Sequence, residues 1–269
     1  MSLFEPWLAR WDLVPDGKPI ATYSSNLLPV VHRGAPAMLK VPFEEEERWG
    51  WLLMTWWNDD GAARVLARDG HVLLLERAMG SRSLAAMAES GRDNDASRII
   101  CQVAGRLHAP RGALPNELIP LQEWFAALAP AVATHGGILR AAAKTARELL
   151  SSPENIVPLH ADLHHGNVLD FGARGWLAID PKRVIGERGF DFANIFCNPD
   201  AAIVLKPGRL ERQATVIAAA ANLHRNRLLK WILTSSGLSA AWIMGDGDYP
   251  AMELAVAEIA AAELERSGG

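Results

Sequence analysis

The chain has 269 residues, of which 49% are hydrophobic, and its formal net charge at pH 7 is −4. Such a chain can bury the core of one large domain or of two lobes, and its mildly acidic charge argues against broad binding to nucleic acid or anionic membranes. The two cysteines, Cys101 and Cys197, are far apart and form no C-x-x-C motif, which is typical of buried free thiols in a reducing compartment.

The first part of the chain alternates short apolar runs with turn residues. Apolar side chains at helical spacing predict a short helix over residues 4–13. A second helix is predicted over residues 44–57. Strands are predicted where β-formers are bounded by turn signals, over residues 20–23, 27–33, 37–41, 63–66 and 71–75.

Charged residues in this part have two interpretations each. Lys40 lies among apolar neighbours in the third predicted strand. Because a lysine is costly to bury unpaired, it either points to water from an edge strand or has a functional partner. The run Glu44-Glu45-Glu46-Glu47 opens the second helix, where acidic side chains ordinarily complement the helix dipole.

The remainder of the chain is predominantly helical in pattern. Apolar periodicity predicts helices from residue 84, over 96–108, 121–133, 138–150, 210–235 and 251–265. Ser236-Gly237 and residues 244–249 predict loops.

Polar residues that could take part in catalysis or metal binding concentrate in residues 157–191. Asp162 lies in the segment His160-Ala161-Asp162, and Asn167 follows five residues later. Two short strands joined by the turn 170–175 predict a hairpin that ends at Asp180. The hairpin brings Asn167 and Asp180 side by side, and their oxygen atoms suit a hard cation such as Mg²⁺. Asp162 precedes the hairpin on a loop that can face a substrate.

The pattern H-x-D-x-x-x-x-N, followed by an aspartate that closes a hairpin, resembles the protein-kinase-like phosphotransferases. The segments HADLHHGNVL and WLAIDPK are more similar to the aminoglycoside phosphotransferase superfamily, in its streptomycin 6-kinase and hydroxyurea phosphotransferase branch. This resemblance implies an α+β, two-lobed protein-kinase-like fold. A five-stranded antiparallel sheet would form the N-lobe over residues 1–77, and a helical C-lobe would cover residues 78–269.

The resemblance also implies an activity, the ATP-dependent transfer of a phosphate to a hydroxyl of a small molecule. The acceptor would be an aminoglycoside-type antibiotic similar to streptomycin, or hydroxyurea. Asp162 would act as the catalytic base, and Asn167 and Asp180 would bind Mg²⁺. Lys40 would hold the phosphates of ATP, paired with Glu47, for which Glu46 is the alternative.

Further residues would surround the nucleotide. Glu76 and Ala78 would offer main-chain atoms to adenine. Ser24-Ser25-Asn26 stands where protein kinases have a glycine-rich loop, and its hydroxyls and amides can still bind phosphate. Lys182 would touch phosphate or substrate, and Asp191 would brace the catalytic loop. Asp170-Phe171-Gly172 spells the DFG motif of protein kinases, but it falls inside the predicted turn, so Asp180 fits the metal role better.

The expected acceptor is a cation held by acidic groups of the C-lobe. Asp246 and Asp248 are candidates, because a loop between helices lets side chains enter a cleft. Three alternatives are a metabolic kinase on the same fold, a nucleotide-binding pseudo-enzyme, and a metal-dependent hydrolase. The hydrolase would use the cluster His160, Asp162, His164 and His165.

The expected location and assembly follow from the same composition. No apolar run approaches the ~20 residues of a spanning helix, and the charged N-terminus does not resemble a signal peptide. A soluble, cytoplasmic monomer or weak dimer, with no nucleic-acid or membrane partner, is therefore expected.

Overall fold

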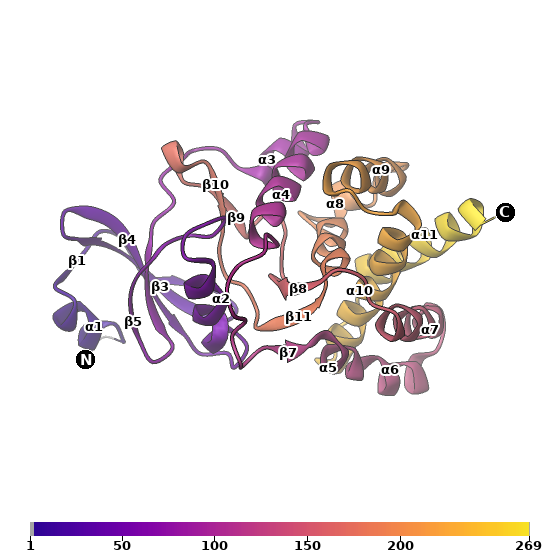
Figure 1. Cartoon of the computed structure of the whole chain (residues 1–269), viewed down its shortest axis with the longest axis horizontal. Helices are drawn as coiled ribbons and strands as arrows, with labels where there is room; N and C mark the ends of the chain where they lie inside the picture. The colour runs from indigo at the N-terminus through magenta and orange to yellow at the C-terminus, as the bar shows by residue number, and fades with distance from the viewer. Residues whose placement is uncertain (1–2, 269) are drawn as a thin grey trace.

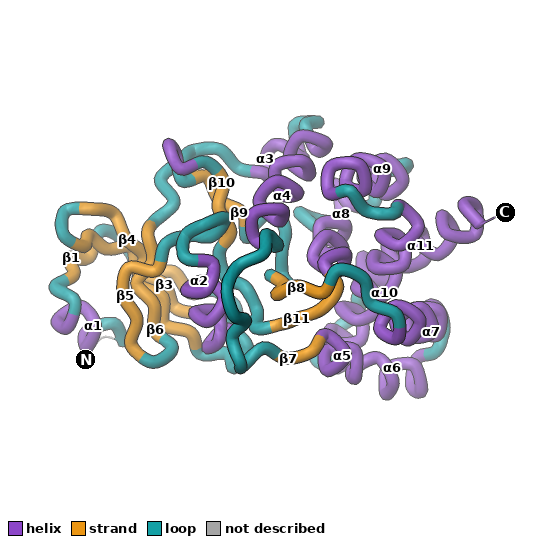
Figure 2. The backbone as a smooth tube through the Cα atoms, viewed as in Figure 1, coloured by secondary structure: helices purple, strands orange, loops and turns teal. Residues whose placement is uncertain are grey.

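The computed structural model describes residues 3–268; for residue 268 this covers the backbone alone. A twisted sheet occupies one end of the molecule and helices fill the other, with the two chain termini at opposite ends (Figure 1). Figure 2 shows that most strands lie at the end of the molecule that holds the sheet, and that only a few short strands lie between this sheet and the helices. The two-lobed α+β fold is therefore confirmed, whereas the exact boundary after residue 77 stays a prediction.

The N-terminal sheet has six antiparallel strands within residues 3–268, one more than predicted. They are β1 (Leu13–Pro15), β2 (Ile20–Ala21), β3 (Ser25–His32), β4 (Ala35–Pro42), β5 (Val65–Asp69) and β6 (Val72–Glu76). The order is β1-β3-β4-β6-β5, and β2 also pairs with β3. The extra strand, β1, follows helix α1 (Glu5–Arg10) directly and pairs Leu13 with His32. A strand of three residues is too short to display the alternation that identifies strands in a sequence.

The first three residues of the acidic run before the second helix do not form helix. A 3-10 segment, η1 (Glu47–Trp49), leads into α2 (Gly50–Trp57), and residues 44–46 form a bend and turn. The helix predicted from residue 44 therefore begins later, because like charges one turn apart destabilise a helix. As a result only the last glutamate of the run, Glu47, turns inward, with 5% of its surface exposed.

From residue 84 onward the described chain is built mainly from helices. They are α3 (Leu84–Glu89), α4 (Asp93–Leu107), α5 (Leu121–Trp124), η2 (Phe125–Ala127), α6 (Leu128–His135), α7 (Ile138–Ser151), η4 (Arg188–Cys197), α8 (Ala201–Val204), α9 (Arg209–Ala221), α10 (Arg225–Gly245) and α11 (Ala251–Gly268). The helix predicted over 210–235 is divided at Asn222, whose left-handed φ of 51° ends α9.

The loop predicted at Ser236-Gly237 is wrong, because α10 continues through it. A Cβ atom on Gly237 would lie 2.5 Å from the Cβ of Ala142 on α7. The glycine therefore allows two helix backbones to approach closely, and packing outweighs its low helix propensity of ~1 kcal/mol relative to alanine.

The predicted hairpin is present between the sheet and the helices. Its strands are β9 (Val168–Asp170) and β10 (Trp176–Ala178), joined through η3 (Gly172–Arg174), and Leu177 pairs with Leu169. A second group of short strands, β7 (Ile119–Pro120), β11 (Val184–Glu187) and β8 (Ile156–Leu159), lies beside it. The loops that leave β8 and β10 carry the residues of the candidate site.

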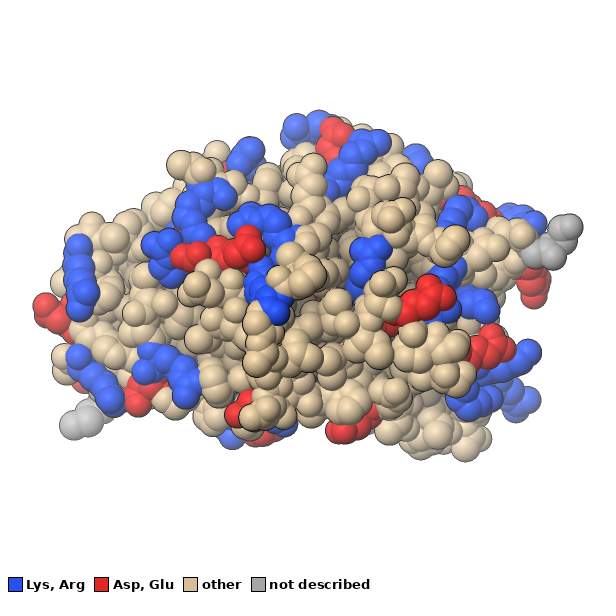
Figure 3. Space-filling model, in the orientation of Figure 1, with Lys and Arg blue, Asp and Glu red and all other residues tan. Residues whose placement is uncertain are grey.

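The surface and the helices bear on possible partners. On the face shown in Figure 3, basic and acidic side chains are interspersed over a largely uncharged surface. Within residues 3–268, no helix combines the length and the apolar character that crossing a membrane requires.

Candidate active site

The loop between β8 and β9 is held by the buried carboxylate of Asp191. Its Oδ1 accepts a hydrogen bond of 2.7 Å from the amide of Ala161, and its Oδ2 accepts one of 2.9 Å from the amide of His160. Nε2 of His108 lies 2.7 Å from the same Oδ2. Ala161 has a φ of 63°, a conformation that a non-glycine residue keeps only when its surroundings fix it. Asp191 thus braces the loop, as predicted.

His160 is a structural residue of this loop. Its ring is buried, stacks on Trp57 with the ring centroids 6.2 Å apart, and has Nε2 2.8 Å from the carbonyl oxygen of Ile179. Burial lowers the pKa of His160 and outweighs the attraction of the nearby carboxylates. A neutral imidazole donates from one nitrogen and accepts at the other, which suits Nδ1 to accept from the amide of Asp162 at 3.3 Å.

Asp162 is positioned by two asparagines. Nδ2 of Asn194 donates to its Oδ1 at 2.9 Å, and Nδ2 of Asn167 donates to its Oδ2 at 3.1 Å. The side chain keeps 32% exposure, so it remains open to a substrate. The sequence reasoning missed Asn194, although it lies one helical turn after Asp191 on η4 and shares its face.

Asn167 and Asp180 meet at the open end of the hairpin, as predicted. The amide of Ile179 donates to the carbonyl oxygen of Asn167 at 2.9 Å, which sets the next residue, Asp180, beside it. Since Asn167 uses Nδ2 to hold Asp162, its Oδ1 makes no hydrogen bond within the described part of the chain. One carboxylate and one amide oxygen side by side fit a hard divalent cation.

Asp170 is engaged elsewhere. Its side chain is 5% exposed and lies 2.7 Å from both Nε and Nη2 of Arg82. The hydrogen bonds from Arg82 hold the pKa of this carboxyl well below its usual range. The main chain of Asp170 also accepts from the amide of Gly80 at 2.9 Å. This supports the choice of Asp180 over Asp170 and shows that Asp170 does more than form a turn.

Lys40 is buried with carboxylates on two sides. Its Nζ lies 2.5 Å from Oε2 of Glu47 and 2.6 Å from Oδ1 of Asp180, and 4% of the side chain is exposed. It therefore does not point to water. Oε1 of the same glutamate pairs with Lys182. Burial opposes the ionisation of Glu47, but the two ammonium groups outweigh it and lower its pKa.

A cavity of about 160 Å³ opens between the sheet and the hairpin, next to Lys40 and Asp180. Its other walls are mainly apolar, from Leu27, Met38, Leu75, Ala78, Leu169, Phe171 and Ile179. The amide of Ala78 makes no hydrogen bond within the described residues. The Glu76 side chain is taken by the amide of Arg64 at 2.6 Å and by Arg174, and its own amide donates to the carbonyl oxygen of Arg64 at 3.0 Å.

The predicted phosphate segment is divided by the structure. Ser24 belongs to the β2–β3 turn, whereas Asn26 lies inside β3 opposite Ala21. Ser25 is 1% exposed, and its Oγ has no partner within the described chain. The turn is stiffened by Oγ1 of Thr22, which accepts from the amide of Ser25 at 2.9 Å.

A second cavity of about 230 Å³ adjoins Asp162 on the helical side. Its wall combines aromatic rings, hydroxyls and charged groups, from Trp124, Phe190, Trp242, Ser235, Ser239, Glu46 and Lys182. The rings of Trp124 and Trp242 meet edge to face with their centroids 5.4 Å apart. Asp246 and Asp248 do not line this cavity within the described residues, which corrects the expectation for this loop. The carboxylates at the wall are Asp162 and Glu46.

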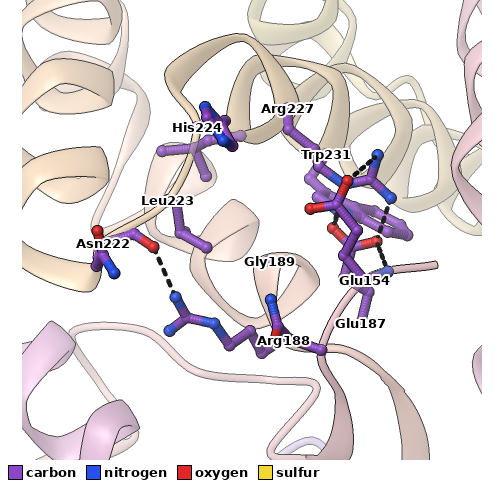
Figure 4. A pocket seen from close by; sticks show the side chains of 11 residues that line it. Glu154, Glu187, Arg188, Gly189, Asn222, Leu223, His224, Arg227 and Trp231 are labelled. Atoms are coloured by element: carbon purple, nitrogen blue, oxygen red, sulfur yellow. Dashed lines mark hydrogen bonds and ion pairs between the residues drawn. The ribbon is translucent and has the colours of Figure 1, made fainter.

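A third cavity, of about 380 Å³, shares no described wall residue with the other two. Figure 4 shows it beside Arg227, Trp231 and Glu187. Glu187 is 4% exposed and accepts from Nε of Arg227 and Nε1 of Trp231, each at 2.7 Å. This wall is a partly buried ion pair that joins β11 to α10, and it contributes no group to the site around Asp162.

The hydrolase alternative is not supported. Within the described residues, no three His, Cys, Asp or Glu side chains come together in a way that could hold a metal. His165 is buried, and neither of its ring nitrogens has a partner there. Burial lowers its pKa to about 4.

The comparison with known proteins agrees with this geometry. Residues 10–247 match the family described as aminoglycoside/hydroxyurea antibiotic resistance kinase. The chain belongs to this family. It is accordingly a kinase, a phosphotransferase whose family acts in antibiotic resistance, and the resemblance predicted from HADLHHGNVL and WLAIDPK is confirmed.

Several relatives match nearly the whole chain. A streptomycin 3''-kinase of Klebsiella pneumoniae is 51% identical over 245 residues, covering 89% of this chain and 92% of that relative. A hydroxyurea phosphotransferase of Kitasatospora aureofaciens is 32% identical, covering 94% and 76%. A streptomycin 6-kinase of Streptomyces griseus is 30% identical, covering 94% and 85%.

Solved structures support the fold. A choline/ethanolamine kinase family protein from Mesorhizobium loti superposes with a TM-score of 0.70 at 14% identity, over 97% of this chain and 93% of that one. A thermostable mutant of the aminoglycoside phosphotransferase APH(4)-Ia, in ternary complex with ADP and hygromycin B, superposes with a TM-score of 0.67 at 15% identity. That superposition covers 100% of this chain and 99% of that one. At these identities the likeness concerns the fold alone.

Proposed function

We propose that this kinase transfers the γ-phosphate of ATP to a hydroxyl of streptomycin, at the 3'' position. The observation that carries the proposal is the 51% identity to a streptomycin 3''-kinase over 92% of that relative. The geometry supports it, because Lys40 lines an apolar cavity and Asp162 lines a second cavity with aromatic and polar walls.

The nucleotide would occupy the cavity of about 160 Å³. Its apolar walls suit an adenine ring, and the free amide of Ala78 and the main chain of Glu76 suit the polar edge of that ring. Lys40 would hold the phosphates, with the hydroxyl of Ser24 and the side chain of Asn26 on the β2–β3 side, whereas the hydroxyl expected from Ser25 is buried away from them. This assignment makes the sheet the nucleotide-binding lobe, over residues 1–77.

Asn167 and Asp180 would hold Mg²⁺, which neutralises phosphate charge when bound. Asp162 would accept the proton of the acceptor hydroxyl and orient its oxygen for attack. Chemistry of this type depends mostly on positioning and charge neutralisation. The braces on Asp162 from Asn167 and Asn194 therefore matter as much as its basicity.

The acceptor would enter the cavity of about 230 Å³ as a cation. Streptomycin carries guanidino groups, and a guanidinium binds favourably over the face of a tryptophan, contributing ~0.5–2 kcal/mol. Trp124 and Trp242 supply such rings, and Glu46 supplies a carboxylate at the same wall. The hydroxyls of Ser235 and Ser239 can bond the sugar hydroxyls.

A coupled assay of ADP release tests the proposal. The purified protein would be given ATP and Mg²⁺ with streptomycin, hygromycin B, hydroxyurea or choline, and the product would be mapped by phosphorus–proton NMR. We expect streptomycin to give the highest kcat/KM and the phosphate to sit on the 3'' oxygen. A higher kcat/KM with choline would favour the metabolic-kinase alternative and refute the proposal.

Substitution of the base complements the panel. Asp162→Asn should lower kcat about 100-fold or more while ATP binding changes little, since removal of a general base costs roughly 10²–10⁴. Retention of more than about a tenth of the turnover would contradict the role of Asp162.

A further inference from the structure

Lys182 lines the cavity beside Asp162 and is linked through Glu47 to Lys40 at the wall of the apolar cavity. Its amide donates to the carbonyl oxygen of His160 at 2.9 Å, which ties its backbone to the catalytic loop. Its ammonium pairs with Glu47 and lies 4.0 Å from Oδ2 of Asp162. Only 12% of the side chain is exposed, and that part faces the cavity beside Asp162.

These contacts complete a row of alternating charges. Asp180 pairs with Lys40, Lys40 pairs with Glu47, Glu47 pairs with Lys182, and Lys182 approaches Asp162. The row begins at the wall of the apolar cavity and ends at the wall of the aromatic one. Glu47 thus orients two lysines, one toward each cavity.

Because Lys182 and Asp162 line the same cavity, a phosphoryl group that moves to an acceptor at Asp162 comes to the wall that Lys182 forms. An ammonium group has three N–H donors, and Glu47 engages only part of that capacity. The side chain lines the cavity, so the remaining donors are available to a group bound there, beside the carboxylate that would bind the acceptor hydroxyl. Positive charge fixed where negative charge develops is among the largest contributions to catalysis.

We propose that Lys182 is a catalytic residue that donates hydrogen bonds to the oxygens of the phosphoryl group during its transfer. The inference rests on the proposed phosphotransfer at Asp162. In that step the acceptor oxygen forms a bond to the γ-phosphorus, and the bond to the bridging oxygen breaks. ADP leaves with that electron pair, and the hydroxyl proton moves to Asp162. Lys182 keeps its proton throughout and stabilises the equatorial oxygens.

The test compares Lys182→Met with Lys206→Met, in which an exposed lysine outside the site changes in the same way. For Lys182→Met we expect kcat to fall about 100-fold or more, as for the loss of a donor to a developing charge. The dissociation constant of ATP should stay within about threefold, because Lys40 still holds the phosphates. A kcat within about threefold of wild type would overturn the proposal, and so would a loss confined to ATP affinity.

A second variant covers the case in which Lys182→Met fails to fold. Lys182→Arg keeps a cation beside Glu47, so the melting temperature should be unchanged. A planar guanidinium does not reproduce the donor geometry of an ammonium, so kcat should still fall about tenfold or more. Full activity of Lys182→Arg with an unchanged melting temperature would assign Lys182 to the structure alone.

Chemical rescue and acceptor-free hydrolysis separate this inference from the proposed function. Ethylammonium should restore kcat of Lys182→Ala about tenfold or more, whereas tetramethylammonium, which has no N–H donor, should not. If wild type fails with streptomycin, the proposed function fails first. Lys182 is then judged by ATP hydrolysis to water, in which the same phosphoryl group moves, and wild-type hydrolysis rates in Lys182→Met would refute its role.

Discussion

Replacement of Asp191 by asparagine separates the position of the catalytic loop from its chemistry. The carboxylate is fully buried and accepts from the amides of His160 and Ala161, with His108 as a third partner. Asparagine offers one carbonyl oxygen, so its NH₂ group must face a buried donor. One amide left without an acceptor costs ~1–3 kcal/mol, and loss of charge from the other bonds adds ~1–2 kcal/mol.

Asp191→Asn should therefore lower the free energy of unfolding by ~2–5 kcal/mol. For a chain of this size that corresponds to a fall of roughly 5–15 °C in melting temperature. At a temperature where the variant is folded, kcat should fall about 100-fold, because a catalytic group displaced by ~1 Å loses that much. The KM for ATP should change less than kcat, since Lys40 lies on β4, outside the loop that Asp191 braces.

The assay combines thermal unfolding with streptomycin-dependent ADP release. Asp200→Asn is the matched control, because Asp200 caps α8 by accepting from the amide of Ile203, and asparagine caps a helix equally well. That variant should keep both stability and kcat. A variant Asp191→Asn with a lowered melting temperature but wild-type kcat would refute the reasoning, since the loop would then hold its position unaided.

Three further predictions concern other parts of the chain. Asp180→Ala should weaken Mg²⁺-dependent ATP binding about tenfold or more in calorimetric titrations. Asp170→Ala should lower only the melting temperature, and the opposite pattern would reverse the metal assignment. Gly237→Ala should cost ~1–3 kcal/mol in urea unfolding through overpacking, and adding Ala142→Gly should recover most of it; no loss would mean that the helices can separate. His165→Gln should flatten the decline of stability between pH 6.5 and 4. In the folded state the pKa of His165 is lowered to about 4, so the unfolded chain binds more protons there, and each pH unit costs up to ~1.4 kcal/mol. An equally steep decline in the variant would exclude this source.

The candidate site residues whose proximity the sequence predicted share one property, which is closeness along the chain. Asp162, Asn167 and Asp180 lie within a loop and a hairpin, and hairpin pairing follows from turn chemistry and strand length. Their proximity could therefore be inferred from spacing alone. Lys40, in the third predicted strand, was recognised because burying an unpaired charge among apolar neighbours is energetically costly, so the charge requires a partner.

Contacts between distant segments could not be inferred in this way. Glu47 and Lys182 are 135 residues apart, and no local pattern marks their pairing. Of the four neighbouring glutamates, Glu47 does pair with Lys40, as predicted. The reason was not visible in the sequence: the chain turns at residues 44–46, before the helix starts, and only Glu47 faces inward. The acceptor cavity shows the same limit. Asp246 and Asp248 matched the expected charge, yet packing of α10 brings Trp242 to the cavity instead.

The segment Asp170-Phe171-Gly172 has the sequence of the DFG motif, but its position in the fold does not suit the metal-binding role of that motif. A Cβ on Gly80 would lie 2.1 Å from Cγ of Asp170, so the chain that leaves the sheet passes directly against this carboxylate. Arg82, two residues later, donates to both of its oxygens. An aspartate whose oxygens are already bonded in this way has little capacity left for a metal ion. Asp180, by contrast, keeps 28% of its side chain exposed, and its partner within the described residues is the ammonium of Lys40, whose three N–H donors also suit phosphate oxygens. The hydrogen-bond partners of each carboxylate, rather than the neighbouring residue types, therefore determine its role. Asp170 holds the connection between the lobes, and Asp180 remains open to a cation.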